Sequence, residues 1–233
     1  MNLSRRTFIT SVALTPIACG TPSGYQSGTP ITQPQPTPVI RAPKVGQEWT
    51  YNQRDLFNGK NLGLVTDRVA SIGATITIER TDESGGRFSN EVQGPWGTVI
   101  TDPHWTRTIS FSPPIALWPQ ELSDRWAKQF ITKYSIAGYP GNLYAWQEYM
   151  SVHGWEQITV PAGTFLTLRY QNLIQYESDD ANKVNCIRKE TIWFAPSIGR
   201  WVVREISGSY MIAGQLGTPN LEDSYQWQLT SYK

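Results

Sequence analysis

The fold of this chain is decided by Val160-Pro-Ala-Gly-Thr-Phe165, by the alternating run that continues to Tyr176, and by Trp193-Phe-Ala-Pro-Ser-Ile-Gly199. In the alternating run every second residue is mostly apolar and the residues between are mostly polar. That period of two is typical of a β-strand with one buried face. Proline lacks an amide donor and glycine accepts a positive φ, so both quoted segments predict turns. We therefore expect consecutive antiparallel strands from Gly154 to Tyr210.

The register of the alternating run is specific. It places Leu166, Leu168 and Tyr170 on a buried face and Thr167, Arg169 and Gln171 on the opposite, more polar face. Further strands are expected at 45–51, 62–72, 74–80, 87–93, 98–101, 142–151, 154–160 and 223–232.

Two other segments are harder to assign. The Asn58-Gly59 pair favours a hairpin turn. Residues 102–120 contain Pro103, Pro113, Pro114 and Pro119, which indicate a long loop or a crossing between two halves of the sheet. Residues 123–130 are compatible with a strand or with a short helix.

The two quoted turn motifs resemble those of bacterial envelope β-sheet proteins of unknown function, in which "VPAGTF" and "WYAPGVG" turns are typical. The resemblance covers roughly the last third of the chain and is also found in Val45-Gly-Gln-Glu-Trp-Thr-Tyr51. It implies a fold similar to the half-open barrel of lipoprotein-localisation factors, and it supplies no catalytic residues. The predicted fold class is therefore all-β, with a single curved antiparallel sheet or a half-open β-barrel.

The N-terminus has the features of an export signal. Arg5 and Arg6 precede a short apolar stretch, which is too short to span a bilayer as a helix. Ser4-Arg-Arg-Thr-Phe-Ile9 resembles the twin-arginine motif, in which the arginine pair is the address read by the translocase. Ile17-Ala-Cys19 resembles the end of a lipobox, which implies that Cys19 is acylated and becomes the new N-terminus. Pro16 departs from the leucine that is usual there.

The domain organisation follows from these segments. Residues 1–18 are expected to be a signal peptide, and residues 19–43 a lipidated N-terminus with a Pro-rich linker. Such a linker has few large apolar residues and is expected to stay extended. Residues 44–233 are expected to form one antiparallel β domain, and the predicted location is the cell envelope, either the periplasm or the outer surface.

Charge and cysteine content exclude several classes of function. The formal net charge is +1, and removing Arg5 and Arg6 with residues 1–18 leaves 18 Lys+Arg against 19 Asp+Glu, a net charge of −1. No basic run favours nucleic-acid binding. If Cys19 is acylated, Cys186 is the only remaining cysteine, and its strand context favours a buried apolar role.

No motif predicts catalysis, a metal site or a cofactor. The only histidines are His104 and His153, too few for a zinc site on their own. Asp102-Pro-His104 could bring a carboxylate and an imidazole together on one loop, but a solvated loop histidine is favoured, and His153 is expected at an exposed turn. Asp179-Asp180 lacks the spaced oxygens of a calcium loop. The sequence therefore predicts no catalytic residue, no metal and no cofactor, and leaves the ligand-binding residues unassigned.

Three functions remain open. The first is a non-enzymatic lipoprotein, anchored to a membrane by lipid, that binds an apolar ligand or an envelope partner on an aromatic-lined sheet. The second is a structural or protein-interaction module whose sheet is filled by its own side chains. The third is a secreted hydrolase, which would require carboxylates or histidines converging in a cleft.

Overall fold

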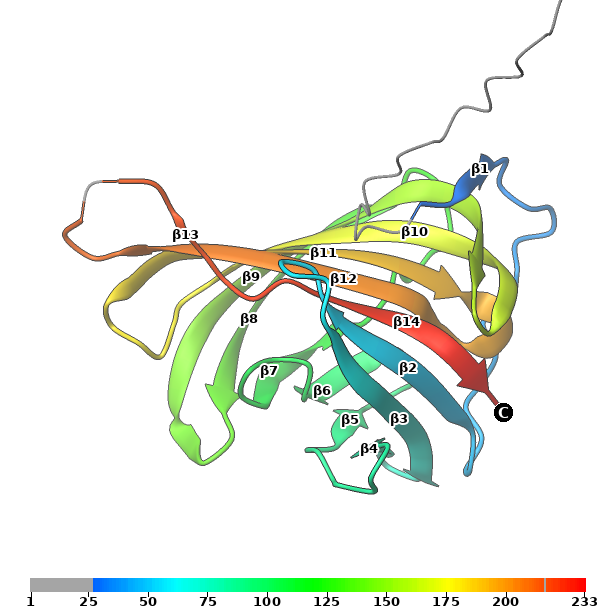
Figure 1. The fold of residues 1–233 in the computed structure, drawn as a ribbon, viewed down its shortest axis with the longest axis horizontal. Helices are drawn as coiled ribbons and strands as arrows, with labels where there is room; N and C mark the ends of the chain where they lie inside the picture. The colour runs from blue at the N-terminus through cyan, green and yellow to red at the C-terminus, as the bar shows by residue number, and fades with distance from the viewer. Residues whose placement is uncertain (1–26, 216) are drawn as a thin grey trace, which may run out of the picture.

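The computed structural model describes residues 27–215 and 217–233, and within them the chain is almost entirely β-structure (Figure 1). The strands are β1 (Thr29–Ile31), β2 (Glu48–Asp55), β3 (Asn61–Ile72), β4 (Ile76–Asp82), β5 (Glu91–Gln93), β6 (Thr98–Asp102), β7 (Ile109–Ala116), β8 (Ala127–Ile136), β9 (Tyr139–Val160), β10 (Gly163–Tyr176), β11 (Lys183–Ala195), β12 (Arg200–Ile212), β13 (Asn220–Leu221) and β14 (Tyr225–Tyr232). One 3₁₀ turn, η1 (Pro196–Ile198), separates β11 from β12.

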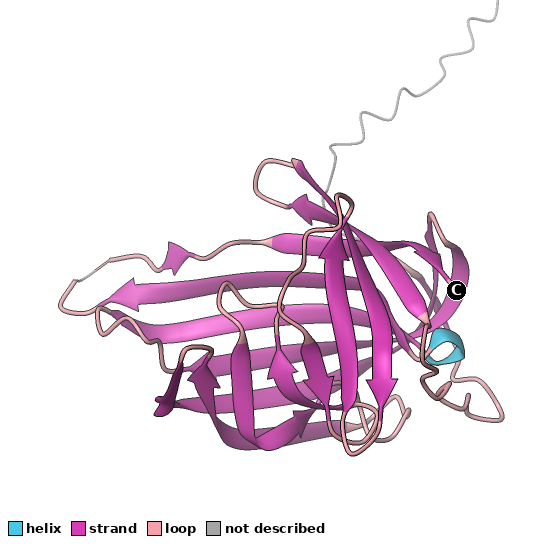
Figure 2. Cartoon of the chain, turned by 90° about the horizontal axis from the view of Figure 1, so that it is seen from below, coloured by secondary structure: helices cyan, strands magenta, loops and turns pink. Residues whose placement is uncertain are grey.

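The strands form one antiparallel sheet that closes on itself. The neighbours run β9-β10-β11-β12-β14-β2-β3-β4-β5-β6-β7-β8, and β8 pairs again with β9, so twelve strands make a barrel. Figure 2 shows these strands wrapped around a common interior. The all-β antiparallel prediction is confirmed. The expectation of a single curved or half-open sheet missed the closure, which depends on the pairing of β8 with the first half of β9.

The barrel is uneven because β9 to β12 are much longer than β5 and β6 (Figure 1). β9 runs as one strand through the point where a turn was predicted. His153 is the extra residue there, since Arg169 pairs with Gly154 while Tyr170 pairs with Val152. Gly154 has φ 113°, which a residue with a side chain rarely adopts. The glycine therefore marks a β-bulge and not a hairpin, and His153 is exposed as expected.

Two further expectations are corrected. Residues 109–116 form β7 although they include Pro113 and Pro114, both of which are exposed. β7 pairs with β8 only from Ile109 to Ser112, so the prolines need not donate to that ladder. Residues 127–136 form β8, and the short helix considered for 123–130 is not formed.

The segment predicted to be a linker lies partly against the barrel. β1 pairs with Trp155–Gln157 of β9. The Arg41 amide donates to the Pro196 carbonyl at 2.9 Å, and Trp96 Nε1 donates to the Arg41 carbonyl at 3.1 Å. Gly199 has φ 67°, and a Cβ there would collide with the Arg41 carbonyl. Residues 29–31 and Arg41 thus contact the barrel, whereas the predicted signal peptide, Arg5, Arg6 and Cys19 lie outside the described residues.

The central register is largely as predicted. Leu168 and Tyr170 are buried, while Leu166, Arg169 and Gln171 are all of intermediate exposure. Thr167, expected on the more polar face, is buried, and its hydroxyl is satisfied by donating to the Glu156 carbonyl at 2.9 Å. Cys186 is a buried free cysteine, as predicted.

Truncation of Leu168 tests this packing. Leu168 is fully buried in the main apolar cluster, and its alanine variant should lose about 2–5 kcal/mol of unfolding free energy, because the cavity cannot fully collapse. Urea unfolding followed by tryptophan fluorescence measures the change. Leu173→Ala, on the exposed face of the same strand, is the matched control and should change the midpoint little. A Leu168→Ala midpoint equal to that of the wild type would contradict the register.

Candidate functional site

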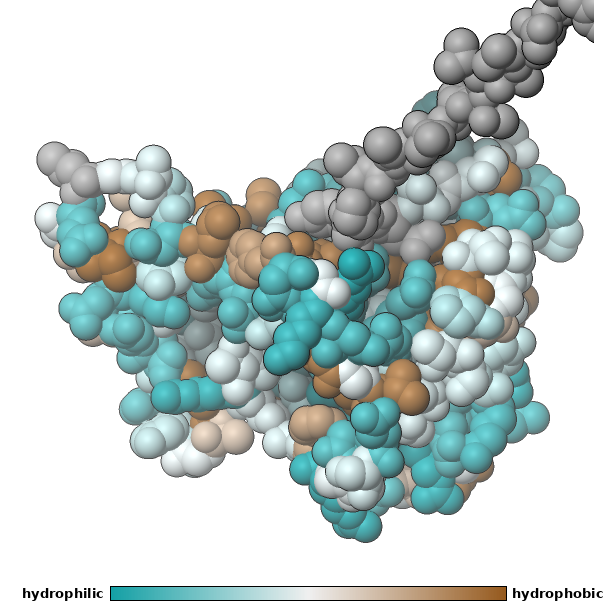
Figure 3. Space-filling view, in the orientation of Figure 1, coloured by the Kyte–Doolittle hydropathy of each residue, from teal (hydrophilic) through white to brown (hydrophobic). Residues whose placement is uncertain are grey.

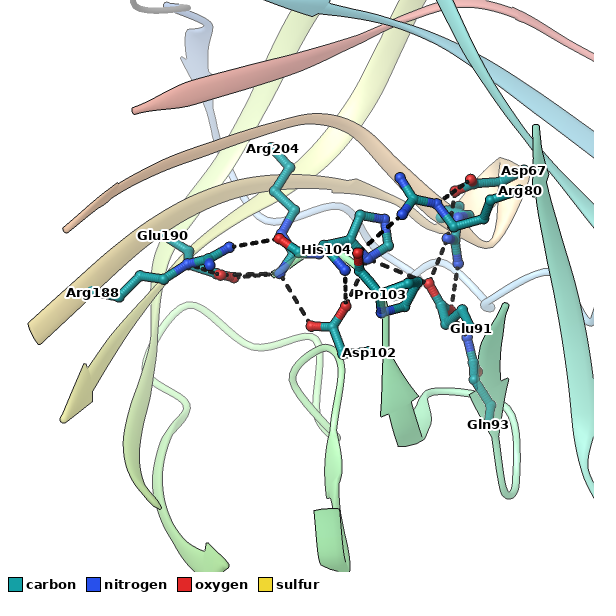
Figure 4. Close-up of polar contacts among 11 residues, drawn as sticks. Asp67, Arg80, Glu91, Gln93, Asp102, Pro103, His104, Arg188, Glu190 and Arg204 are labelled. Atoms are coloured by element: carbon teal, nitrogen blue, oxygen red, sulfur yellow. Dashed lines mark hydrogen bonds and ion pairs between the residues drawn. The ribbon is translucent and has the colours of Figure 1, made fainter. Parts of the chain in front are cut away.

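A network of charged side chains crosses the interior of the barrel. Its members come from β3 to β6 and the loop after β6 on one side, and from β11 and β12 on the other. These two groups of strands are not adjacent in the sheet. They are Asp67, Arg80, Glu91, Asp102, His104, Arg188, Glu190, Arg200 and Arg204, and all are at least nine-tenths buried. Figure 4 shows most of them converging between the two walls. We call this set the ionic network.

Arg200 is the hub of one half of the ionic network. Its Nη2 donates to Asp67 Oδ2 at 2.7 Å and to Glu91 Oε2 at 2.8 Å, and its Nη1 donates to Glu91 Oε1 at 3.0 Å. Arg80 Nε donates to Asp67 Oδ1 at 3.0 Å. Burial raises the pKa of the Asp67 carboxyl, but Arg80 and Arg200 outweigh it and hold that pKa below its usual range. The pKa of Glu91 is lowered in the same way, since Arg200 outweighs burial.

The other half joins β6 to β11 and β12. Arg204 Nη2 donates to both carboxylate oxygens of Glu190 at 3.0 Å and lies 3.6 Å from Asp102 Oδ2. His104 Nδ1 lies 2.7 Å from Asp102 Oδ1. Burial opposes ionisation of Asp102, but His104 and Arg204 outweigh it and lower its pKa strongly. Burial, with Arg80 nearby, lowers the pKa of His104, so the imidazole is neutral at pH 7.

The placement of His104 corrects a prediction. The loop does bring Asp102 and His104 together, but the imidazole is buried and not solvated, with a side chain only 1% exposed. Its Nε2 is buried and has no partner among the described residues. The ring lies edge-on to Trp201 and Trp227, at centroid distances of 5.9 and 6.0 Å. A general base must reach a proton on its substrate, and this nitrogen is buried in a ring packed against two tryptophans, so the pair is suited to holding the barrel walls together.

Glu148 of β9 lies beside the ionic network, and the pKa of its carboxyl group is raised. Burial and the nearby Glu190 carboxylate raise its pKa to about 8. Its Oε2 accepts from Trp146 Nε1 at 3.2 Å, while Oε1 is buried without a partner in the described part of the chain. With Glu148 protonated and His104 neutral at pH 7, the charges within the ionic network balance: Arg80, Arg188, Arg200 and Arg204 against Asp67, Glu91, Asp102 and Glu190.

The barrel interior is filled. The cavity beside Glu148, Asn172 and Tyr170 measures only about 30 Å³, which is room for about one or two waters. Two apolar clusters occupy the rest, one around Trp49, Trp155 and Phe194 and the other around Phe111 and Trp146. An interior filled in this way has no lumen for an acyl chain.

The main recess that reaches this interior lies at one end of the barrel, and we call it the mouth cavity. It measures about 500 Å³ and is bordered by the 104–107 loop, the β10–β11 turn and the chain around β13. Its aromatic lining is Trp105, Tyr134, Tyr176, Tyr210 and Tyr225; its charged lining is Arg107, Asp179, Asp180, Lys183, Arg188, Glu222 and Asp223. Asp179-Asp180, read from sequence as a solvated turn, is thus on the rim of the cavity.

A second recess, of about 960 Å³, is lined by residues of β7 to β11, which include the buried Trp146 and Cys186. The exposed residues Ile131, Gln147 and Gln175 line it, and its charged groups are the exposed Lys133 and Glu177. It contains no member of the ionic network. The mouth cavity is the better candidate site because its floor includes a buried, charged side chain, Arg188.

Neither a metal nor a membrane helix is found in the part of the chain that the structure describes. Among residues 27–215 and 217–233, no group of three or more His, Cys, Asp and Glu side chains is placed to hold a metal ion. No helix in those ranges is long and apolar enough to cross a membrane. In the view of Figure 3 the surface is mostly hydrophilic, with hydrophobic residues in separate patches.

Comparison with known proteins identifies the fold and no family. No family model matches the chain, and no curated protein matches it. A solved structure of a candidate lipoprotein from Parabacteroides distasonis is similar, with TM-score 0.52 and 14% identity over 85% of this chain and 100% of that one. The chain shares its fold.

Two other solved structures are more distant. One is a candidate exported protein with a YmcC-like fold from Bacteroides fragilis, with TM-score 0.46 and 13% identity, covering 84% of this chain and 99% of that one. The other is the hypothetical lipoprotein YmcC from Escherichia coli, with TM-score 0.43 and 9% identity, covering 79% of this chain and 84% of that one.

Proposed function

We propose that this protein is an exported, lipid-anchored envelope protein without enzymatic activity, and that its barrel binds a ligand in the mouth cavity. The proposal of export and anchoring rests on Arg5, Arg6 and Cys19 in their sequence context. It is supported by the fold shared with the Parabacteroides distasonis candidate lipoprotein.

The observation that carries the binding proposal is the contrast between interior and mouth. The interior cavity of about 30 Å³ excludes an acyl chain, whereas the mouth cavity of about 500 Å³ has the size of a small-molecule site. We therefore propose a ligand bound at the end of the barrel and not an apolar ligand inside it. The hydrolase alternative loses support, because the imidazole of His104 is sealed from solvent.

A structural module with no small ligand is the remaining alternative, and the filled interior favours it as well. Native mass spectrometry of the protein purified without denaturant separates the two. A mass above that of the polypeptide with its N-terminal modification, lost on mild activation, is expected for a binding protein. A protein that carries no added mass and binds none of a broad metabolite extract would support the structural module.

Anchoring is tested at Cys19. Thioether formation with diacylglycerol requires a thiol, so Cys19→Ser should abolish acylation and release the protein from membranes. Two or more acyl chains attach a protein stably to a membrane, and the variant would carry none of them. Fractionation and the intact mass of the N-terminal peptide are the measurements, and Cys186→Ser is the matched control that should remain membrane-bound.

Two results would contradict parts of this proposal. Soluble wild-type protein with an unmodified Cys19 would exclude the lipid anchor. Normal export of the variant with both Arg5→Lys and Arg6→Lys would leave the anchor in place but remove the twin-arginine route.

A further inference from the structure

The floor of the mouth cavity presents an unused hydrogen-bond donor. Arg188 is 5% exposed, and its guanidinium lies over the Trp105 ring at 3.8 Å from the centroid. Its Nε is 2.9 Å from Glu190 Oε1, and its Nη2 donates to the His104 carbonyl at 3.4 Å. No acceptor for Nη1 is found among residues 27–215 and 217–233. Nη1 is also not one of the fully buried atoms left without a partner, and Arg188 lines the cavity, so this nitrogen can donate to an acceptor atom that enters the cavity.

The charges around the cavity disfavour an anion as the source of that acceptor. Arg107 pairs with Asp179 at 2.6 Å and Lys183 with Glu222 at 3.7 Å, while Glu190 neutralises Arg188. Asp180 and Asp223 add two more carboxylates to the lining. An incoming carboxylate or phosphate would therefore meet more negative than positive charge.

The lining also disfavours a purely apolar ligand, because it combines donors and acceptors with aromatic rings. Tyr176 donates from its hydroxyl to Glu222 at 2.8 Å, and the Lys183 ammonium lies 4.2 Å from the centre of the Tyr210 ring. Carboxylates accept, ammonium and guanidinium groups donate, and a hydroxyl group of a ligand can do both. The aromatic rings offer apolar surface to C–H groups.

From this combination we infer that the mouth cavity binds a neutral, hydroxyl-rich ligand of the saccharide class, with Arg188 Nη1 donating to one of its oxygens. This inference rests on the proposed function and specifies its ligand. Saccharides carry hydroxyls that donate and accept together with apolar C–H faces, which matches the lining of this cavity. A fatty acid has the wrong polarity for the lining, and an acidic oligosaccharide has the wrong charge.

Saturation-transfer NMR on the purified mature protein tests the inference. The neutral probes are maltotriose, cellotriose, mannotriose and chitotriose, and the comparison probes are trigalacturonate and hexadecanoate. We expect at least one neutral trisaccharide to bind at concentrations up to about 10 mM, a range that weak specific sites reach. Absence of binding by all four, or binding by a comparison probe in preference to them, would overturn the inference.

Variants locate the binding. Arg188→Met should lower the affinity for the neutral probe that binds best by about tenfold or more, which is the factor that one charge-assisted hydrogen bond supplies. Arg68→Met, far from the cavity with a side chain 52% exposed, is the matched control and should bind as the wild type does. If Arg188→Met fails to fold, Lys183→Met at the rim should weaken the same probe. Equal binding by a folded cavity variant would overturn the assignment.

The test of the saccharide inference can fail without the proposed function failing. A ligand of another class found by native mass spectrometry, with no trisaccharide bound, would remove the saccharide inference and keep the binding function. Loss of membrane association in Cys19→Ser does not depend on either result.

Discussion

Replacement of Arg200 by methionine is expected to lower the free energy of unfolding at pH 7 by about 3–5 kcal/mol. Arg200 is 1% exposed and makes three hydrogen bonds to Asp67 and Glu91, which are equally buried. Methionine fills much of the same volume but leaves the Glu91 side chain with the Gln93 side-chain amide, at 2.6 Å, as its hydrogen-bond donor among the described side chains, and with the neutral His104 ring 3.9 Å away. The loss therefore comes mainly from an uncompensated buried carboxylate. Urea unfolding at pH 7 measures it.

Arg68→Met is the matched control for this experiment. The Arg68 Nε lies 3.4 Å from Glu48 Oε1 in an ion pair at the surface, with side chains 52% and 23% exposed. Exposed pairs of this kind contribute about 0–1 kcal/mol, because water screens them. A loss in Arg200→Met no greater than that in Arg68→Met would show that the ionic network does not stabilise the barrel.

Acid should reduce the difference in unfolding free energy between the wild type and Arg200→Met. The folded-state pKa values of Asp67 and Glu91 lie below their usual values. Their contribution to stability is thus present above the unfolded pKa values, near 4, and is lost as the pH falls through the lower folded values. Without Arg200, protonation of these carboxyls relieves the buried charge, so the unfolding free energies of the two proteins should begin to converge below about pH 4 and continue to do so as the pH falls through the folded-state values.

The strands could be predicted from sequence where one face alone is apolar, as from Leu166 to Ile174. Closure of the barrel could not, since it depends on β8 meeting β9, and residues 127–136 carry too many polar residues to identify a partner. β7 was missed for a local reason: prolines argue against a central strand, yet Pro113 and Pro114 lie beyond its pairing with β8.

The ionic network was missed because charged residues were taken to mark the solvent face. A signal was nevertheless present in β11. Arg188 and Glu190 share the alternation of Cys186 and Ile192, the buried side of the strand, while Lys189 between them is exposed. A charged residue in phase with apolar ones indicates a buried charge that requires a partner. Its partner cannot be read from one strand, because Glu190 bonds to Arg204, which lies on the next strand.

Glu148→Gln is expected to make the protein more stable than wild type in mild alkali. Burial and the Glu190 carboxylate raise the folded-state pKa of Glu148 to about 8, above its unfolded value. A raised carboxyl pKa contributes stability that is fully present below the unfolded pKa, near 4.3, and is lost as the pH rises through the folded pKa. Ionisation of Glu148 should therefore cost the wild type several kcal/mol by about pH 9.

Glutamine keeps the acceptor for Trp146 Nε1 and cannot ionise, so the variant should lack this decline. The lowered pKa of His104 acts in the opposite sense, adding stability as the pH rises toward 6.5, and it is common to both proteins. The difference between wild type and Glu148→Gln from pH 5 to 9 therefore isolates Glu148. Urea midpoints across this range measure it, with Glu121→Gln as the exposed control. Parallel pH profiles for wild type and Glu148→Gln would mean that Glu148 is ionised in the folded barrel, and the charge balance of the ionic network would then have to include it.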